Sequence, residues 1–174
     1  MKKGGGREKG SRFEREVAKI VVRAFADKGI TQKDCYRTPL SGGHRFAAQS
    51  DPGDLVISER LRRFFPYAVE CKSYKKLDWP KLISNAKQKG HWDKWWRQAT
   101  KAADAQSCGR GLDRLYPLLI FRQNRSEIYV MGEASLMQSF TVPVKIPYVV
   151  TRVDGLKVRV VLFSRFMEAI TCSR

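Results

Sequence analysis

The segment FFPYAVECKSYKK (residues 64–76) places two opposite charges at the end of an apolar run that predicts a buried strand. Glu70 and Lys72 have the same parity on a strand, so their side chains project to one face while Cys71 projects to the other. One interpretation is an ion pair at the rim of a sheet, which contributes little. The alternative is a carboxylate and an ammonium group that act together in a catalytic site.

A second carboxylate, Asp54, directly precedes the apolar run LVI. We expect this strand and the strand YAVECK to form a hairpin that brings Asp54 near Glu70. Asp51 competes for the same role, and Asp54 is preferred because it abuts the strand. Two converging carboxylates repel each other unless a cation or a shared proton intervenes, and hard oxygen ligands suit Mg²⁺ or Mn²⁺. With Lys72 holding an attacking water or stabilising charge on a phosphate, these groups fit phosphodiester hydrolysis.

The elements that position these residues begin with a helix. Residues 1–9 are rich in Gly and Lys, lack apolar periodicity and indicate a flexible basic arm. From Ser11 the apolar spacing predicts a helix to about Lys28, in which Ser11 and Glu14 match a capping box. Short strands follow in KDCYRTPLSGG and GDLVIS, and ERLRR forms a turn into the strand with the two charges.

The second half of the chain alternates helical and strand patterns. The segment WPKLISNAKQKGHWDKWWRQATKAADAQ has helical composition, with a break or bend near Gly90. Two hairpins follow, in RLYPLLIFRQNRSEIYVMG and in PYVVTRVDGLKVRVVLF, and the second has the type I′ turn pair Asp154-Gly155. SRFMEAI predicts a short C-terminal helix. We therefore expect one α/β domain over residues 10–174, with a mixed, mainly antiparallel central sheet flanked by helices.

The charge of the chain indicates a polyanionic partner. The 174 residues include 34 Lys and Arg against 17 Asp and Glu, giving a formal net charge of +17. Nucleic acid is favoured over an acidic membrane because no helix pairs a basic face with a wide exposed apolar one. Four scattered cysteines without a C-x-x-C pair suggest neither a zinc site nor disulfides, and small core residues are the simplest interpretation. No apolar run approaches a membrane span of about 20 residues, so a cytoplasmic protein is expected.

Several short motifs resemble known nucleases. The Asp of DPGD before one strand and ECK at the end of the next resemble the PD-(D/E)XK nuclease superfamily. KGSRFERE and YRTPLSGG are further similar to archaeal-type Holliday junction resolvases, with Glu14 four residues after Gly10 and Ser41 four residues after Arg37. The resemblance, over roughly residues 9 to 73, implies a restriction-endonuclease-like fold, Mg²⁺ or Mn²⁺ on Asp54, Glu70 and Glu14, branched DNA as substrate and a homodimer.

The remaining candidates each have a structural alternative. Glu14 completes a capping box or belongs to the site, and Ser41 forms a turn with Gly42 and Gly43 or helps to bind a phosphate. The superfamily often carries a Gln on the helix after E-x-K, and Gln98 is the matching position. Trp92, Trp95, Trp96 and Ala99 have the spacing of a core stripe, with a base-stacking platform as the alternative.

We expect the catalytic set to be Glu14, Asp54, Glu70, Lys72, Ser41 and Gln98, and the DNA-binding set to be Arg37, Ser41, Gly42, Gly43, Lys9, Arg12 and Lys75. Two other functions stay open. The same site could cut ordinary duplex or single-stranded DNA, or the chain could be a basic nucleic-acid-binding protein without activity, for which its charge alone suffices.

Overall fold

Five strands form the central sheet, in the order β3-β4-β5-β7-β6. β3 and β4 are parallel and every other neighbouring pair is antiparallel, which confirms the mixed, mainly antiparallel sheet. The computed structural model describes residues 5–39, 53–84, 89–108, 114–141 and 146–172. The strands of this sheet are β3 Tyr67–Tyr74, β4 Tyr116–Gln123, β5 Ile128–Glu133, β6 Tyr148–Val153 and β7 Leu156–Leu162.

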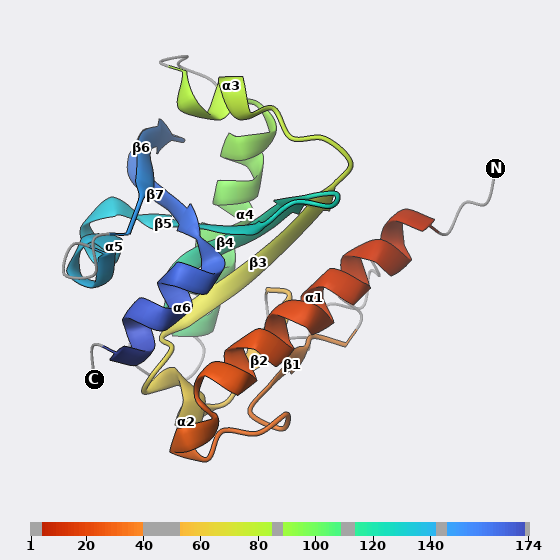
Figure 1. The fold of residues 1–174 in the computed structure, drawn as a ribbon, viewed down its shortest axis with the longest axis vertical. Coiled ribbons are helices and arrows are strands. Elements are labelled where there is room, and N and C mark those ends of the chain that lie inside the picture. The colour runs from red at the N-terminus through yellow and green to blue at the C-terminus, as the bar shows by residue number, and fades with distance from the viewer. Residues whose placement is uncertain (1–4, 40–52, 85–88, 109–113, 142–145, 173–174) are drawn as a thin grey trace.

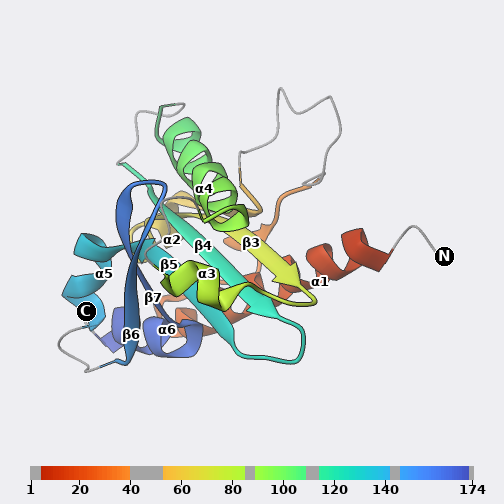
Figure 2. The same ribbon diagram turned by 90° about the horizontal axis from the view of Figure 1, so that it is seen from above.

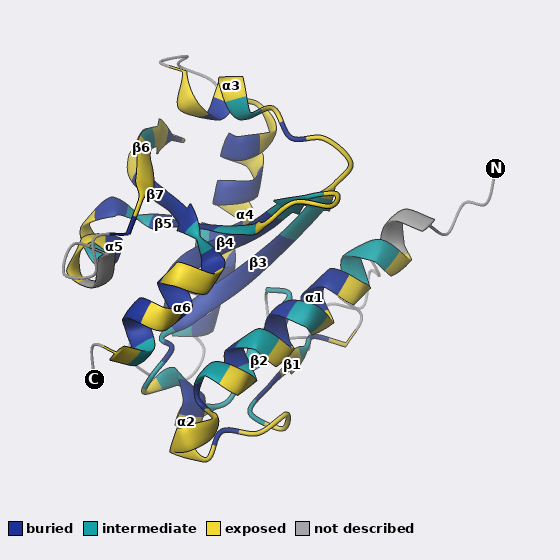
Figure 3. Ribbon diagram, in the orientation of Figure 1, coloured by how far each residue is buried: buried dark blue, intermediate teal, exposed yellow. Residues whose placement is uncertain are grey.

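Helices cover both faces of the sheet. Figures 1 and 2 show α1 and α6 on one face and α4 on the other. The helical elements are α1 Gly5–Ala24, the 3-10 helix η1 Ala26–Lys28, α2 Glu59–Arg62, α3 Trp79–Ile83, α4 His91–Cys108, α5 Ala134–Thr141 and α6 Phe163–Cys172. The sequence predicted a helix at the position of α6 but none at the positions of α5 or the short α2. This two-faced cover explains why the central strands are buried along most of their length (Figure 3).

The strand β3 divides its side chains between two hydrophobic clusters. Val69 and Cys71 pack in the cluster that contains the buried residues of α1 and α6. Ala68 packs instead against Ala102 and Ala103 of α4. Because side chains alternate along a strand, Glu70 and Lys72 belong to the Ala68 face and not to the Cys71 face. This confirms the parity expected from ECK.

The first helix starts earlier than the sequence predicted. It begins at Gly5, so residues 5–9 belong to α1 rather than to a non-helical arm. The Nζ of Lys9 donates a hydrogen bond to Asn124, next to the end of β4, and Glu8 in the first turn interacts favourably with the helix dipole. These two features support the start of α1 at Gly5, which residue propensities did not predict. Ser11 therefore lies inside the helix and does not cap it.

The pairing of the short strands also differs from the prediction. β2 (Leu55–Ile57) pairs antiparallel with β1 (Cys35–Arg37), not with β3. β3 pairs instead with β4 in parallel, through a connection that contains α3 and α4. Ser58 caps α2 by accepting a hydrogen bond from the N–H of Leu61, so ERLRR forms a short helix where a turn was expected.

The predicted hairpins and the tryptophan core are confirmed. β4 pairs with β5 and β6 pairs with β7, with positive φ angles of 50° at Asp154 and 79° at Gly155, as a type I′ turn requires. Trp92, Trp95 and Trp96 are at most 5% exposed, so the stripe is core.

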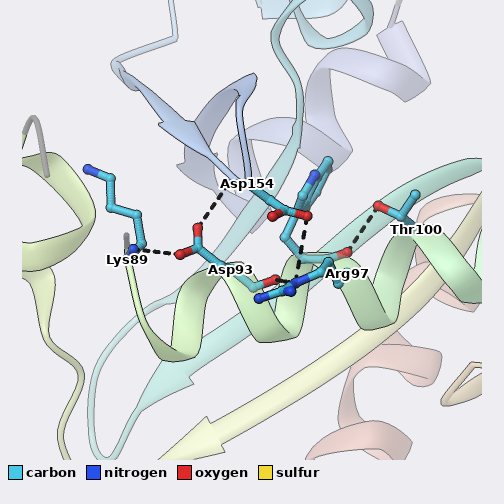
Figure 4. A network of polar contacts seen from close by, with 6 residues as sticks. Lys89, Asp93, Arg97, Thr100 and Asp154 are labelled. Atoms are coloured by element: carbon cyan, nitrogen blue, oxygen red, sulfur yellow. Dashed lines mark hydrogen bonds and ion pairs between the residues drawn. The ribbon is translucent and has the colours of Figure 1, made fainter. Parts of the chain in front are cut away.

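A buried aspartate fixes the start of α4 (Figure 4). The carboxylate of Asp93 accepts a hydrogen bond from the N–H of Lys89 at 2.5 Å and another from the N–H of Asp154 at 2.9 Å. Gly90, with a φ of 65°, separates α3 from α4, as the break in the helical pattern predicted. Asp93 therefore joins the first turn of α4 to the β6–β7 turn and holds this helix against the sheet.

Candidate active site

Glu70 and Lys72 form an ion pair near the end of β3. The Nζ of Lys72 lies 2.5 Å from Oε1 of Glu70, and the two side chains are 18% and 11% exposed. The pair is therefore largely buried, unlike the exposed ion pairs that contribute little. Burial of both charges is costly unless each is paired, so the pair makes Glu70 and Lys72 dependent on each other.

Asp54 is held against β3 although its strand does not pair with β3. Its backbone N–H donates to the carbonyl of Val69 at 3.0 Å, and its carbonyl accepts from the N–H of Thr38 at 2.9 Å. Its side-chain Oδ2 accepts a hydrogen bond from the N–H of Cys71 at 2.7 Å. The predicted hairpin between the strand of Asp54 and β3 is wrong. Asp54 nevertheless lies beside β3, close to Glu70, as predicted.

Gly53 allows this close approach. Its φ of +104° lies outside the range that other residues adopt readily. A Cβ atom at this position would lie 3.3 Å from the carbonyl oxygen of Val69 and 3.2 Å from Nε2 of Gln106. The glycine before Asp54 therefore permits both the backbone conformation and the contact with β3.

The electrostatic environment of Asp54 favours its protonated form. Burial, followed by the negative charge of Glu70, raises the pKa of Asp54 to about 7, and the charge of Glu14 adds to the rise. The hydrogen bond from Cys71 and the charge of Lys72 act in the opposite direction. Burial opposes the charge of Lys72, but its contact with Glu70 outweighs this and raises the pKa of Lys72. Three carboxylates and one ammonium group thus influence one another at this point.

Glu14 reaches this region from α1. It is 8% exposed, and its Oε2 accepts a hydrogen bond from Nε of Arg37 at 2.5 Å. Arg37 ends β1, and Thr38 after it contacts Asp54, so Glu14 and Asp54 are linked through β1. The capping-box interpretation of Glu14 is wrong, because Ser11 lies within the helix. Arg37 was predicted to bind DNA, and here it pairs with Glu14.

Gln98 lies in the part of α4 that runs beside β3. One turn before it, Trp95 contacts Tyr74 of β3, and one turn after it, Ala102 lies 3.7 Å from the Cβ position at Gly53. Gln98 is exposed between these two contacts. Its assignment to the catalytic set stays a prediction.

Gln106 contacts residues around the site and was not among the predicted site residues. It is 5% exposed on α4 and accepts a hydrogen bond from Nη2 of Arg62 at 3.3 Å. Its amide also lies beside Gly53. The helical spacing from Ala99 and Ala102 to Gln106 places it on the buried face, and a polar residue on that face was the available signal.

The other predicted DNA contacts are spread over the surface. Arg12 is exposed and lines a hollow on α1 together with Arg15, Lys19 and Arg23. Lys75 is exposed directly after β3, and Lys9 contacts Asn124. Ser41, Gly42 and Gly43, as well as the alternative carboxylate Asp51, lie outside the described residues.

The donor chemistry of the site fits a divalent cation of the hard type. Asp54 and Glu70 supply carboxylate oxygens, and burial followed by the charge of Glu70 raises the pKa of Asp54. Within the described residues, no three His, Cys, Asp or Glu side chains are grouped as metal ligands. Glu14 is paired with Arg37 and Glu70 with Lys72, so a cation bound by Asp54 and Glu70 would share Glu70 with Lys72.

Comparison with known proteins identifies the family. A family model described as "Phage putative PDDEXK endonuclease" matches residues 5–173. The chain belongs to this family. Membership confirms the PD-(D/E)XK superfamily expected from DPGD and ECK, and the mixed sheet with its helices is consistent with the restriction-endonuclease-like fold. The match does not support the more specific likeness to archaeal-type Holliday junction resolvases.

Membership in this phage PDDEXK endonuclease family indicates a nuclease of the PD-(D/E)XK type and implies DNA as the partner. PD-(D/E)XK nucleases generally use divalent metals. No curated protein and no solved structure matches the chain. No helix in the described ranges is long and apolar enough to cross a membrane.

Proposed function

We propose that the chain is a Mg²⁺- or Mn²⁺-dependent endonuclease that hydrolyses DNA phosphodiester bonds at the site formed by Asp54, Glu70 and Lys72. The observation that carries this proposal is the position of Asp54, whose carboxylate lies beside β3 with a pKa raised to about 7 by burial and by Glu70. A purely structural aspartate would more often be stabilised in its charged form. The site therefore has negative charge that a cation or a proton must offset.

The residues have separate roles in this proposal. Asp54 and Glu70 hold the metal, and Glu14 joins them directly or through water. Bound Mg²⁺ or Mn²⁺ would polarise the phosphate and lower the pKa of the attacking water. Lys72 donates hydrogen bonds from its ammonium group to that water or to a phosphate oxygen on which charge develops.

The hydrogen bonds around the site keep these groups in place. The N–H of Cys71 orients the carboxylate of Asp54, and Glu70 orients the ammonium group of Lys72. Arg37 holds Glu14 and prevents an unpaired buried charge on α1. These contacts position the side chains of Glu14, Asp54 and Lys72 before DNA binds.

The excess of positive charge supports binding to DNA. The net charge of +17 favours phosphate contacts, which supply affinity without base specificity. Exposed Arg12 and Lys75 are candidates for such contacts. This positive charge offsets the repulsion between a phosphate and the carboxylates of Glu70 and Asp54.

The test compares the parent protein with Glu70→Gln on three DNAs of matched length, a four-way junction, a duplex and a single strand. We expect cleavage by the parent with Mg²⁺ or Mn²⁺ and none in EDTA. Cleavage by a homodimer at a branch point is the finer hypothesis taken from the sequence, and it predicts preference for the junction and a dimeric mass in solution. A monomer that cuts duplex and junction equally would be a nuclease without junction specificity, and the junction hypothesis would be rejected.

A further inference from the structure

An exposed tyrosine ends the strand that carries the two charges. Tyr74 follows Lys72 by two residues, so the two side chains share one face of β3 and are separated by about 7 Å along the strand. Tyr74 is 40% exposed. An aromatic ring thus stands next to the candidate active site and is open to solvent on one side.

A fixed tryptophan supports this ring. The ring centroids of Tyr74 and Trp95 are 4.7 Å apart, with 39° between the planes. Trp95 is 5% exposed and packs edge-on against Trp92 with centroids 5.1 Å apart. His91 stacks on Trp95 with centroids 5.8 Å apart and 24° between the planes. Trp92 and His91 hold Trp95 in place, and Trp95 in turn restricts Tyr74. The side chain of Tyr74 would therefore lose less conformational entropy when a base stacks on it.

Exposed lysines adjoin the aromatic group in the sequence. Lys75 and Lys76 follow Tyr74 directly and are exposed, and Lys94 is exposed beside Trp95. An aromatic face among lysines is the combination with which proteins bind single-stranded nucleic acid, since the lysines attract phosphates and the ring stacks on a base. In a paired duplex both faces of each base are covered by its neighbours, so only an unpaired base can use such a ring.

We propose that Tyr74, supported by Trp95, stacks on an unpaired base of the DNA strand that enters the site at Glu70 and Lys72. This inference rests on the proposed nuclease function, and it makes the substrate a strand with at least one unpaired nucleotide near the cleaved phosphate. Trp95 itself stays in the core, as its burial requires. The base would stack on the exposed face of Tyr74 and would not contact Trp95.

The experiment measures binding in EDTA, so that it does not depend on cleavage. The probes are a labelled single strand and an abasic strand of the same length, which keeps the phosphates and lacks the bases. The variants are Tyr74→Leu, which keeps Trp95 covered, and Tyr74→Phe, which keeps the ring. Tyr148→Leu is the matched control, because Tyr148 is 49% exposed on β6, the strand at the opposite edge of the sheet from β3. Thermal unfolding checks that each variant is folded.

We expect the parent to bind the base-bearing strand about tenfold more tightly than the abasic strand. Tyr74→Leu should lose this preference and bind both strands as the parent binds the abasic one, whereas Tyr74→Phe and Tyr148→Leu should keep it. Equal binding of both strands by the parent, or an unchanged preference in a folded Tyr74→Leu variant, would overturn the proposal. Absence of metal-dependent cleavage would instead refute the nuclease function and leave the binding result to be judged separately.

Discussion

Replacement of Asp54 by Asn should make the metal-free protein more stable at alkaline pH. Burial and the charge of Glu70 raise the pKa of Asp54 from 3.8 to about 7 in the folded state. Between these two values the folded protein holds a proton that the unfolded chain has released. The free energy of unfolding of the parent therefore falls as the pH rises through this window. Asn has no charge to lose, and its side-chain oxygen can still accept the hydrogen bond from Cys71.

The size of the effect follows from the shift. Each pKa unit corresponds to about 1.4 kcal/mol, so a rise of about three units sets an upper bound of about 4 kcal/mol on the advantage of Asp54→Asn at pH 8. Near pH 4, where Asp54 is largely protonated in the folded state, the advantage should be small. Such a gain in stability with loss of activity is typical of a group kept for function.

The assay is urea unfolding of the parent and the variant in EDTA at several pH values between about 4 and 8. The difference between the two free energies of unfolding should grow as the pH rises. Adding Mg²⁺ at pH 8 should stabilise the parent and have less effect on Asp54→Asn, because a ligand stabilises the state that binds it. Parallel pH curves for the two proteins would refute the electrostatic account of Asp54.

Three further predictions concern other residues. Glu70→Gln should bind duplex DNA in EDTA at least as tightly as the parent, because a negative charge beside the phosphate is removed, and a salt titration of binding measures this. Gly53→Ala should destabilise the protein by about 1 to 3 kcal/mol in urea unfolding, since its φ is +104°, whereas Gly155→Asn, at a turn with open space, should be nearly neutral. The N–H of Thr31 and then the hydroxyl of Ser58 lower the pKa of Asp34. Asp34→Asn should therefore be less stable than the parent above about pH 4, and urea unfolding should show the difference shrinking as the pH falls below that value toward the lowered pKa.

The local part of the site was predictable because strand parity is a property of the sequence. Glu70 and Lys72 share a face on any regular strand, and the strand pattern of YAVECK is strong. The type I′ turn at Asp154 and Gly155 was predictable because its geometry depends on two adjacent residues. These features need no knowledge of the distant chain.

The long-range part was not predictable in the same way. Successive strands favour a hairpin, but β3 takes β4 as its parallel partner and leaves β2 to β1. Glu14 matched a local capping pattern, whereas its observed partner, Arg37, is 23 residues away. The start of α1 depends in part on the contact between Lys9 and Asn124, which no local propensity contains. Tertiary contacts decide each of these three features.

The carboxylates of Asp54 and Glu70 should make this member of the phage PDDEXK endonuclease family cut DNA with a divalent metal. The most direct measurement is cleavage of labelled DNA by the parent, Asp54→Asn and Glu70→Gln, each with Mg²⁺ and with EDTA. We expect cleavage only by the parent with metal, and a loss of orders of magnitude in both variants although they still bind DNA. Equal cleavage in EDTA, or normal cleavage by both variants, would rule out this metal-dependent site.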